Sequence, residues 1–170
     1  MSIFGFITNE QMSYSKHNAL LDISFNKERG WNNDFKALFK GYLGEVVFAD
    51  YYGLDRPEAF RGLKPAWDFS VNGLKVDIKA SGFVNVKTSG LRVSVENYKE
   101  YIDLYVFVLL NERVGNFHII GYTSPDELEF EGGFYKKCWD ELFPIEDIFS
   151  KYDIEGYCLN VKHCKQSILL

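Results

Sequence analysis

Two aspartates and a lysine in one short segment are the residues of this sequence best suited to chemistry. Asp68 and Asp77 flank the dipeptide Asn72-Gly73, and Lys79 follows. Asn-Gly between two alternating apolar runs favours a two-residue hairpin turn, because both central residues of that turn take positive φ. In such a hairpin Asp68 lies directly across from Asp77, and Lys79 lies two residues farther along the same face.

Facing carboxylates of this kind indicate a bound cation. Their mutual repulsion is of order 3 kcal/mol at an effective dielectric constant near 20. Magnesium offsets that repulsion, since it prefers oxygen ligands and typically uses one or two carboxylates together with water and substrate phosphate. The neighbouring lysine can hold the attacking water or stabilise the charge that builds on the phosphate. The pattern therefore predicts phosphodiester hydrolysis by metal-activated water, with magnesium as the cofactor and manganese as its substitute.

The face of the hairpin opposite the aspartates supports the predicted register. The two-residue loop predicts three apolar cross-strand pairs, which are Val71 with Leu74, Phe69 with Val76, and Trp67 with Ile78. One face of the hairpin is then entirely apolar and suited to a core, while the face with the aspartates stays polar.

A long helix upstream carries the third candidate acid, Glu45. Apolar residues recur at three- and four-residue spacing from about residue 34 to about residue 52, and Gly53 should end the helix. Gly41 and Gly44 come just before Glu45, and glycine within a helix costs about 1 kcal/mol relative to alanine. Something is therefore expected to approach the helix closely there, with Glu45 directed at the hairpin.

The remaining pattern predicts a mixed sheet flanked by helices. Thr8 and Gln11 have capping-box spacing and indicate a short helix over residues 8–22. Strands are expected over 91–95, 103–110 and 116–122, a short helix over 96–101, and a further helix beginning at Ser124-Pro125. With 170 residues, 46% of them apolar, and no linker, the chain is predicted to be one α+β domain spanning residues 1–170.

Charge is distributed unevenly along the chain. The net charge is −5, yet residues 61–92 hold six basic and two acidic residues, a net of +4, which leaves −9 for the rest. A basic segment on an acidic protein suits a polyanionic partner. Lys75, Ser81, Lys87 and Arg92 are the candidate phosphate contacts in nucleic acid.

Other functional classes have weak support in the sequence. No apolar run approaches the ~20 residues of a membrane span, and the N-terminus lacks the features of a signal peptide, so a cytoplasmic protein without a membrane partner is expected. Cys158, His163 and Cys164 lack a second pair of ligands for a zinc site. The cysteines are therefore interpreted as structural.

Four short motifs together resemble the PD-(D/E)XK nuclease superfamily, in particular its small phage and prokaryotic members. They are Gly41-Tyr42-Leu43-Gly44-Glu45, Trp67-Asp68-Phe69, Val76-Asp77-Ile78-Lys79-Ala80-Ser81, and the later Gly121-Tyr122-Thr123-Ser124-Pro125-Asp126-Glu127-Leu128. The resemblance covers about residues 35–128. One position departs from the family pattern, because Trp67 stands where the family name records a proline.

The resemblance implies a restriction-endonuclease-like αβββαβ core and an endonuclease that cuts DNA to leave a 5′-phosphate. It implies Asp68 and Asp77 as metal ligands, the Ile78 carbonyl as a further ligand, Glu45 as an auxiliary acid and Lys79 as the catalytic lysine. Domains of this type often act as homodimers.

Three alternatives stay open at this point. The aspartates and Lys79 could form a solvated hairpin face with an ion pair worth under about 1 kcal/mol, and Glu45 could lie on a solvent-facing side of its helix. The protein could keep the fold and bind nucleic acid without cutting it. It could also cut RNA or branched DNA.

Overall fold

The structure is a computed structural model that describes residues 2–28, 34–59, 67–71, 73–82, 91–99 and 101–145. Its helices are α1 (Asn9–Glu28) and α2 (Phe35–Tyr52), with 3₁₀ turns η1 (Val95–Asn97), η2 (Pro125–Glu127) and η3 (Trp139–Glu141). Its strands are β1 (Ile3–Phe6), β2 (Phe69–Val71), β3 (Leu74–Gly82), β4 (Leu91–Ser94), β5 (Leu104–Asn111), β6 (Asn116–Thr123), β7 (Glu129–Glu131) and β8 (Phe134–Lys137).

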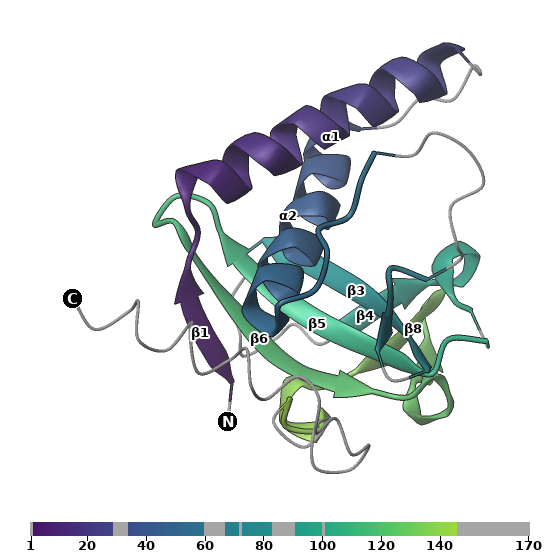
Figure 1. Ribbon diagram of the computed structural model, residues 1–170. Helices are drawn as coiled ribbons and strands as arrows, with labels where there is room; N and C mark the ends of the chain where they lie inside the picture. The colour runs from purple at the N-terminus through teal and green to yellow at the C-terminus, as the bar shows by residue number, and fades with distance from the viewer. Residues whose placement is uncertain are drawn as a thin grey trace.

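A mixed five-stranded sheet forms the centre of the protein. Its strand order is β1-β6-β5-β3-β2, in which β3 and β5 run parallel and the other neighbours are antiparallel. A second sheet of order β4-β8-β7 is antiparallel throughout. Helix α2 lies over the central sheet and α1 packs across α2 (Figure 1). The predicted α+β class with a mixed sheet is therefore confirmed.

Both helices begin as their sequences predict. At the start of α1 the Thr8 amide donates to Gln11 Oε1 (2.8 Å) and the Gln11 amide donates to Thr8 Oγ1 (3.1 Å), which is the expected capping box. The helix then runs past the predicted end at residue 22. Asp34 caps α2 by accepting from the Lys36 amide, and Gly53 ends it with φ of 67°.

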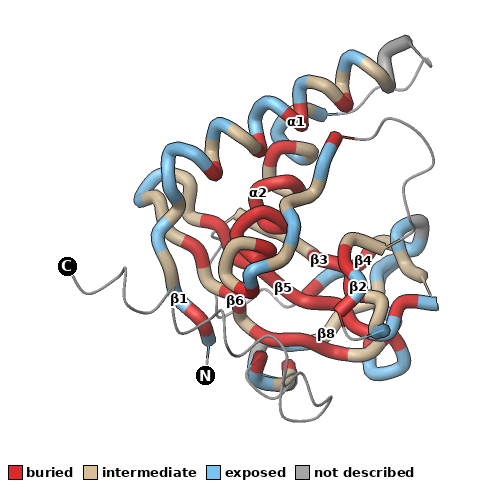
Figure 2. Tube along the Cα trace, viewed as in Figure 1, coloured by how far each residue is buried: buried red, intermediate tan, exposed pale blue. Residues whose placement is uncertain are grey.

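The central sheet has a hydrophobic core on each face. Alternate residues of β3 and β5, among them Val76, Ile78 and Val106, pack with α2 in the first core. The intervening residues of β5, Tyr105, Phe107 and Leu109, pack in the second core with β4 and with Leu128. Unbroken buried runs extend from Tyr42 to Ala49 in α2 and from Leu104 to Leu110 in β5 (Figure 2). The second face is thus covered by strands.

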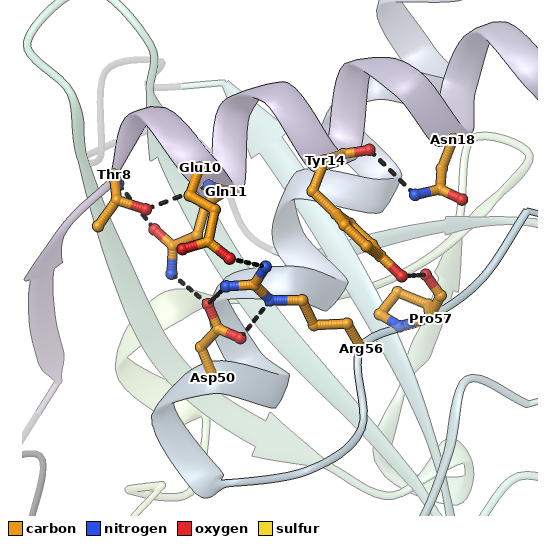
Figure 3. Close-up of polar contacts among 8 residues, drawn as sticks. All are labelled: Thr8, Glu10, Gln11, Tyr14, Asn18, Asp50, Arg56 and Pro57. Carbon is orange, nitrogen blue, oxygen red and sulfur yellow. Dashed lines mark hydrogen bonds and ion pairs between the residues drawn. The ribbon is translucent and has the colours of Figure 1, made fainter.

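A polar cluster fastens α1 and the segment after α2 to α2. The Arg56 guanidinium donates to both carboxylate oxygens of Asp50 (2.7 and 2.8 Å) and to Glu10 (2.7 Å). Gln11 donates to the same Asp50 (2.8 Å), and the Tyr14 hydroxyl donates to the Pro57 carbonyl (3.1 Å) (Figure 3). These contacts hold α2 in place beneath α1.

Several elements differ from the prediction. The predicted strands near 91, 103 and 116 are confirmed as β4, β5 and β6. The helix predicted at Ser124-Pro125 is wrong: only one 3₁₀ turn forms, because the chain then becomes β7 and turns back through Gly132 and Gly133, both at positive φ. The predicted helix over 96–101 is likewise a 3₁₀ turn, η1.

The specific αβββαβ core is not confirmed. Strand β4 joins the second sheet instead of the hairpin's sheet. Within the part of the chain that the structure describes, the connection from β3 to β5 contains β4 and η1 but no α-helix. Strand β1, which the sequence did not predict, adds to the opposite edge beside β6.

Candidate functional site

The hairpin keeps its predicted register only near the turn. Val71 pairs with Leu74 and Phe69 with Val76, as expected. Asn72 lies outside the described residues. The ladder ends at Phe69, and the Asp68 amide donates to the Val76 carbonyl (3.0 Å), so Asp68 is not the ladder partner of Asp77. The prediction that these aspartates face each other directly is therefore wrong.

Trp67 shows the consequence of this irregularity. It was expected on the apolar face opposite Ile78, but it packs against the second core, on the other side of the sheet. Its indole N–H donates to Ser70 Oγ (2.9 Å), and the Lys75 ammonium lies 5.1 Å from its ring centroid. The change of face between Trp67 and Phe69 is what an irregular residue at Asp68 produces, because side chains otherwise alternate.

Asp68 is nevertheless held beside β3. Its Oδ2 accepts the Ile78 amide at 2.7 Å. The Ile78 N–H on the β2 side of β3 needs an acceptor. The Asp68 carboxylate provides it, in the place where a backbone carbonyl of a longer β2 would lie. Asp68 is thus fixed next to the residue that follows Asp77.

Asp77 is the buried charge of the site, with only 2% of its surface exposed. Its carboxylate forms ion pairs with Lys79, two residues along the same face of β3, and with Lys99 (Nζ to Oδ1, 3.0 Å). A buried carboxylate is tolerated only when charged or hydrogen-bonding partners compensate it. The ammonium groups of Lys79 and Lys99 supply that compensation. The sequence pattern predicts a metal ion in this role.

Tyr105 of β5 lies next to Asp77, on the same face of the sheet. It pairs with Asp77 in the parallel β3–β5 ladder and is fully buried. Its hydroxyl accepts the Lys99 amide (2.8 Å) and donates to the Lys99 carbonyl (3.4 Å), while the Lys79 ammonium lies 5.4 Å from its ring centroid. Burial raises the pKa of Tyr105 to about 12. Tyr105 therefore stays protonated and fixes the backbone of Lys99.

Lys99 and Tyr105 were not among the residues identified from the sequence. Both reach the site through the parallel contact of β3 with β5, which joins segments far apart in the chain. Only a weak sequence signal points to Tyr105, which carries a hydroxyl group within the largely apolar run of β5.

Glu45 lies on the other side of β3. A Cβ at Gly44 would overlap the Ala80 Cβ and approach Ile78, so α2 packs on the face that carries Ile78 and Ala80. Asp77 and Lys79 alternate with these residues and face the second core. Glu45 is a buried residue of α2, as expected for a side chain directed inward. The alternative that Glu45 lies on a solvent-facing side of its helix is therefore excluded.

The two helix glycines have different surroundings. The predicted close approach is confirmed at Gly44, where Ala80 lies against the helix. It is not confirmed at Gly41, where a Cβ would meet no described residue within 4 Å. The close packing is thus confined to one helical position.

The candidate nucleic-acid contacts are partly described. Lys75 and Ser81 alternate onto the same face of β3 as Asp77 and Lys79; the Lys75 amide donates to Asp103 (2.7 Å) and the Ser81 hydroxyl donates to the Gly82 carbonyl (3.3 Å). Arg92 is exposed on β4.

Lys87 lies outside the described residues, as do Cys158, His163 and Cys164.

Within the described ranges, no three His, Cys, Asp or Glu residues gather closely enough to hold a metal ion. Asp77, Lys79 and Asp68 are brought together on or beside β3, whereas Glu45 is placed on the helix side. Neither described helix has the length and apolar character needed to cross a bilayer.

Comparison with protein-family models, with curated proteins and with solved structures gives no match. The assignment of function therefore rests on the geometry of the site and on the motifs.

Proposed function

We propose that this protein is a metal-dependent endonuclease that hydrolyses phosphodiester bonds in DNA. The observation that carries the proposal is the buried Asp77 carboxylate held against Lys79 on one face of β3, with Asp68 fixed to the Ile78 amide beside it. A buried acid next to a lysine on a rigid strand is costly to maintain for stability alone, and such groups gather at functional sites.

The donor set suits magnesium in its usual protein mode, which needs only one or two carboxylates in addition to water and substrate oxygens. Asp77 and Asp68 would hold the ion, with the Ile78 carbonyl as a further ligand. The motifs imply Glu45 as an auxiliary acid, but its place on the α2 side of β3 does not support that role. When bound, the ion would supply an activated water and stabilise charge on the phosphate. The absence of a three-carboxylate group among the described residues is compatible with this mode.

The lysines have a defined part in this proposal. Both Asp77 oxygens are now engaged by ammonium groups, so cation binding requires Lys79 and Lys99 to move from the carboxylate. Lys79, once displaced, can orient the attacking water or donate to the phosphate oxygens. The Lys99 side chain can swing away while its backbone stays fixed by the bonds with the Tyr105 hydroxyl.

DNA is the proposed partner because the face of β3 that bears Asp77 also carries Lys75, Lys79 and Ser81. Lys75 and Ser81, together with Lys87 and Arg92, are the proposed phosphate contacts. A cytoplasmic location, expected from the sequence, and a homodimer, implied by the family resemblance, belong to the same proposal.

The testing experiment is cleavage of supercoiled plasmid, linear duplex, single-stranded DNA, a branched junction and RNA, each with magnesium, manganese or EDTA. Wild type is compared with Lys79→Ala and with Lys16→Ala, a control at an exposed lysine on α1. Metal-dependent cutting that is lost only in Lys79→Ala supports the proposal. Cutting confined to RNA or to the junction would replace DNA duplex as the substrate.

One observation favours a second candidate function, a nucleic-acid-binding protein without catalysis. The charge of Asp77 is already compensated by Lys79 and Lys99, which is the arrangement that a purely structural acid would have. Under this candidate no substrate is cut by folded protein with any metal, and Asp77→Asn binds nucleic acid as wild type does.

A further inference from the structure

A cavity of about 550 Å³ opens at the end of the sheet where β3 and β5 finish. Its wall is formed by Lys36 and Lys40 of α2, Gly82 at the end of β3, and residues 110–114 at the end of β5 and in the turn that follows. We call this space the basic cavity. It differs from the site at Asp77, none of whose residues line it.

The charges around the basic cavity are unbalanced. Lys36, Lys40 and Arg113 face one acid, Glu112, whose carboxylate is 3.7 Å from the Lys40 ammonium. That distance is long for an ion pair, and both side chains are partly exposed, so the pair is weak. The lining therefore carries a net positive charge.

The two lysines stand where α2 disfavours them. They are four residues apart in α2, and Lys36 lies in the first turn, which contains no acid beyond the N-cap Asp34. Like charges at this spacing repel each other, and Lys36 opposes the helix dipole, each at a cost of a few tenths of a kcal/mol. An anion in the basic cavity would offset both effects.

Packing also holds one of these cations at the cavity wall. The Lys40 ammonium lies 2.9 Å from where a Cβ on Gly82 would be, so it sits directly over the backbone at the end of β3. Any larger residue at position 82 would have to push this ammonium aside. Gly82 thus leaves room for a cation in the cavity.

We infer that the basic cavity binds a backbone phosphate of the nucleic acid on which the proposed nuclease acts, at a point separate from the Asp77 site. This inference rests on the proposed function. Gly82 is three residues beyond Lys79 in β3, about 10 Å along the strand, and it faces α2, whereas Lys79 lies on the opposite face of the sheet. The basic cavity is an anchoring site for the nucleic acid, distinct from the reacting phosphate.

The test measures binding separately from cleavage. Labelled duplex DNA is titrated without divalent metal into wild type, Lys36→Ala, Arg113→Ala and the control Lys16→Ala, over a range of salt concentrations. Lys36→Ala and Arg113→Ala are each expected to weaken binding several-fold and to lower the slope of log affinity against log salt by about 1. Lys16→Ala, with the same change of charge, is expected to bind as wild type.

Glu112→Gln is the decisive variant, because it removes the only acid that the described cavity wall contributes. It is expected to tighten binding several-fold, and a folding defect cannot produce that result. Equal affinities for wild type, Lys36→Ala and Glu112→Gln would overturn the inference. Stabilisation of wild type by inorganic phosphate, lost in Lys36→Ala while DNA binding is equal in both, would overturn it in favour of a small phosphate ligand.

The same proteins separate failure of this inference from failure of the proposed function. If the nuclease proposal is wrong but the inference is right, no DNA is cut and binding still depends on Lys36 and Glu112. If the nuclease proposal is right and the inference wrong, Lys79→Ala loses cleavage while Lys36→Ala binds and cuts as wild type does.

Discussion

Replacement of Gly44 by alanine tests how α2 is seated on the strand that carries the site. The new methyl group would overlap the Ala80 Cβ, which belongs to β3 between Lys79 and Ser81. Gly41→Ala is a matched control one turn earlier in the same helix, because a Cβ there meets none of the residues that the structure describes within 4 Å. The two variants make the same chemical change in the same element.

The expected magnitudes follow from two effects. Glycine to alanine within a helix contributes about 1 kcal/mol of stability through propensity, and both variants gain it. Overpacking a close contact costs typically about 1–3 kcal/mol, and only Gly44→Ala incurs that cost. Gly41→Ala should therefore be about 1 kcal/mol more stable than wild type, and Gly44→Ala about 1–3 kcal/mol less stable than Gly41→Ala.

Urea denaturation measures these differences in free energy of unfolding, and thermal denaturation should show about 2–4 °C per kcal/mol. The double variant Gly44→Ala with Ala80→Gly removes the overlapping methyl group. It should therefore show a favourable coupling energy relative to the two single changes. A Gly44→Ala protein as stable as Gly41→Ala, with no coupling to Ala80→Gly, would refute the placement of α2 on β3.

Asp77→Asn should destabilise the protein by about 2 kcal/mol in urea denaturation, because it removes the buried charge that binds Lys79 and Lys99; unchanged or higher stability would contradict these pairs. Asp50→Asn should cost about 1–3 kcal/mol through loss of its bidentate bond with Arg56 and its contact with Gln11, whereas the exposed control Asp55→Asn should have little effect. The pKa of Tyr105 is raised from 10 to about 12 in the folded protein, so the unfolded chain loses this proton first; the contribution of Tyr105 to stability is present below pH 10 and is lost as pH rises from 10 to 12. Urea denaturation of wild type and Tyr105→Phe across that interval measures it, and identical pH dependence would contradict the burial of Tyr105.

Much of the local structure could be predicted because it is specified by neighbouring residues. The Thr8–Gln11 capping box, the Asp34 cap and the Gly53 terminus each depend on residues within one turn of the helix end. The register of Val71 with Leu74 likewise follows from the loop between them.

The site itself depends on contacts that local patterns do not specify. Lys99 and Tyr105 reach Asp77 only because β5 lies parallel to β3, and that pairing is made by a long connection. Strict alternation up to Trp67 predicts facing aspartates, and that prediction is wrong because the ladder becomes irregular at Asp68. Gly41 and Gly44 look alike in the sequence, and only the position of Ala80 distinguishes them.

The most direct test of the central proposal is the rate at which supercoiled plasmid is nicked in magnesium by wild type and by Lys79→Ala, with EDTA as the metal-free control. Wild type is expected to cut the plasmid, and EDTA to abolish that cutting. Lys79→Ala is expected to lose at least about a hundredfold in rate, the usual contribution of a group that stabilises the transition state. Equal cutting by both proteins would contradict a catalytic Lys79. No cutting by folded wild type would contradict the nuclease assignment and favour a binding protein whose Asp77 is a structural ion-pair partner.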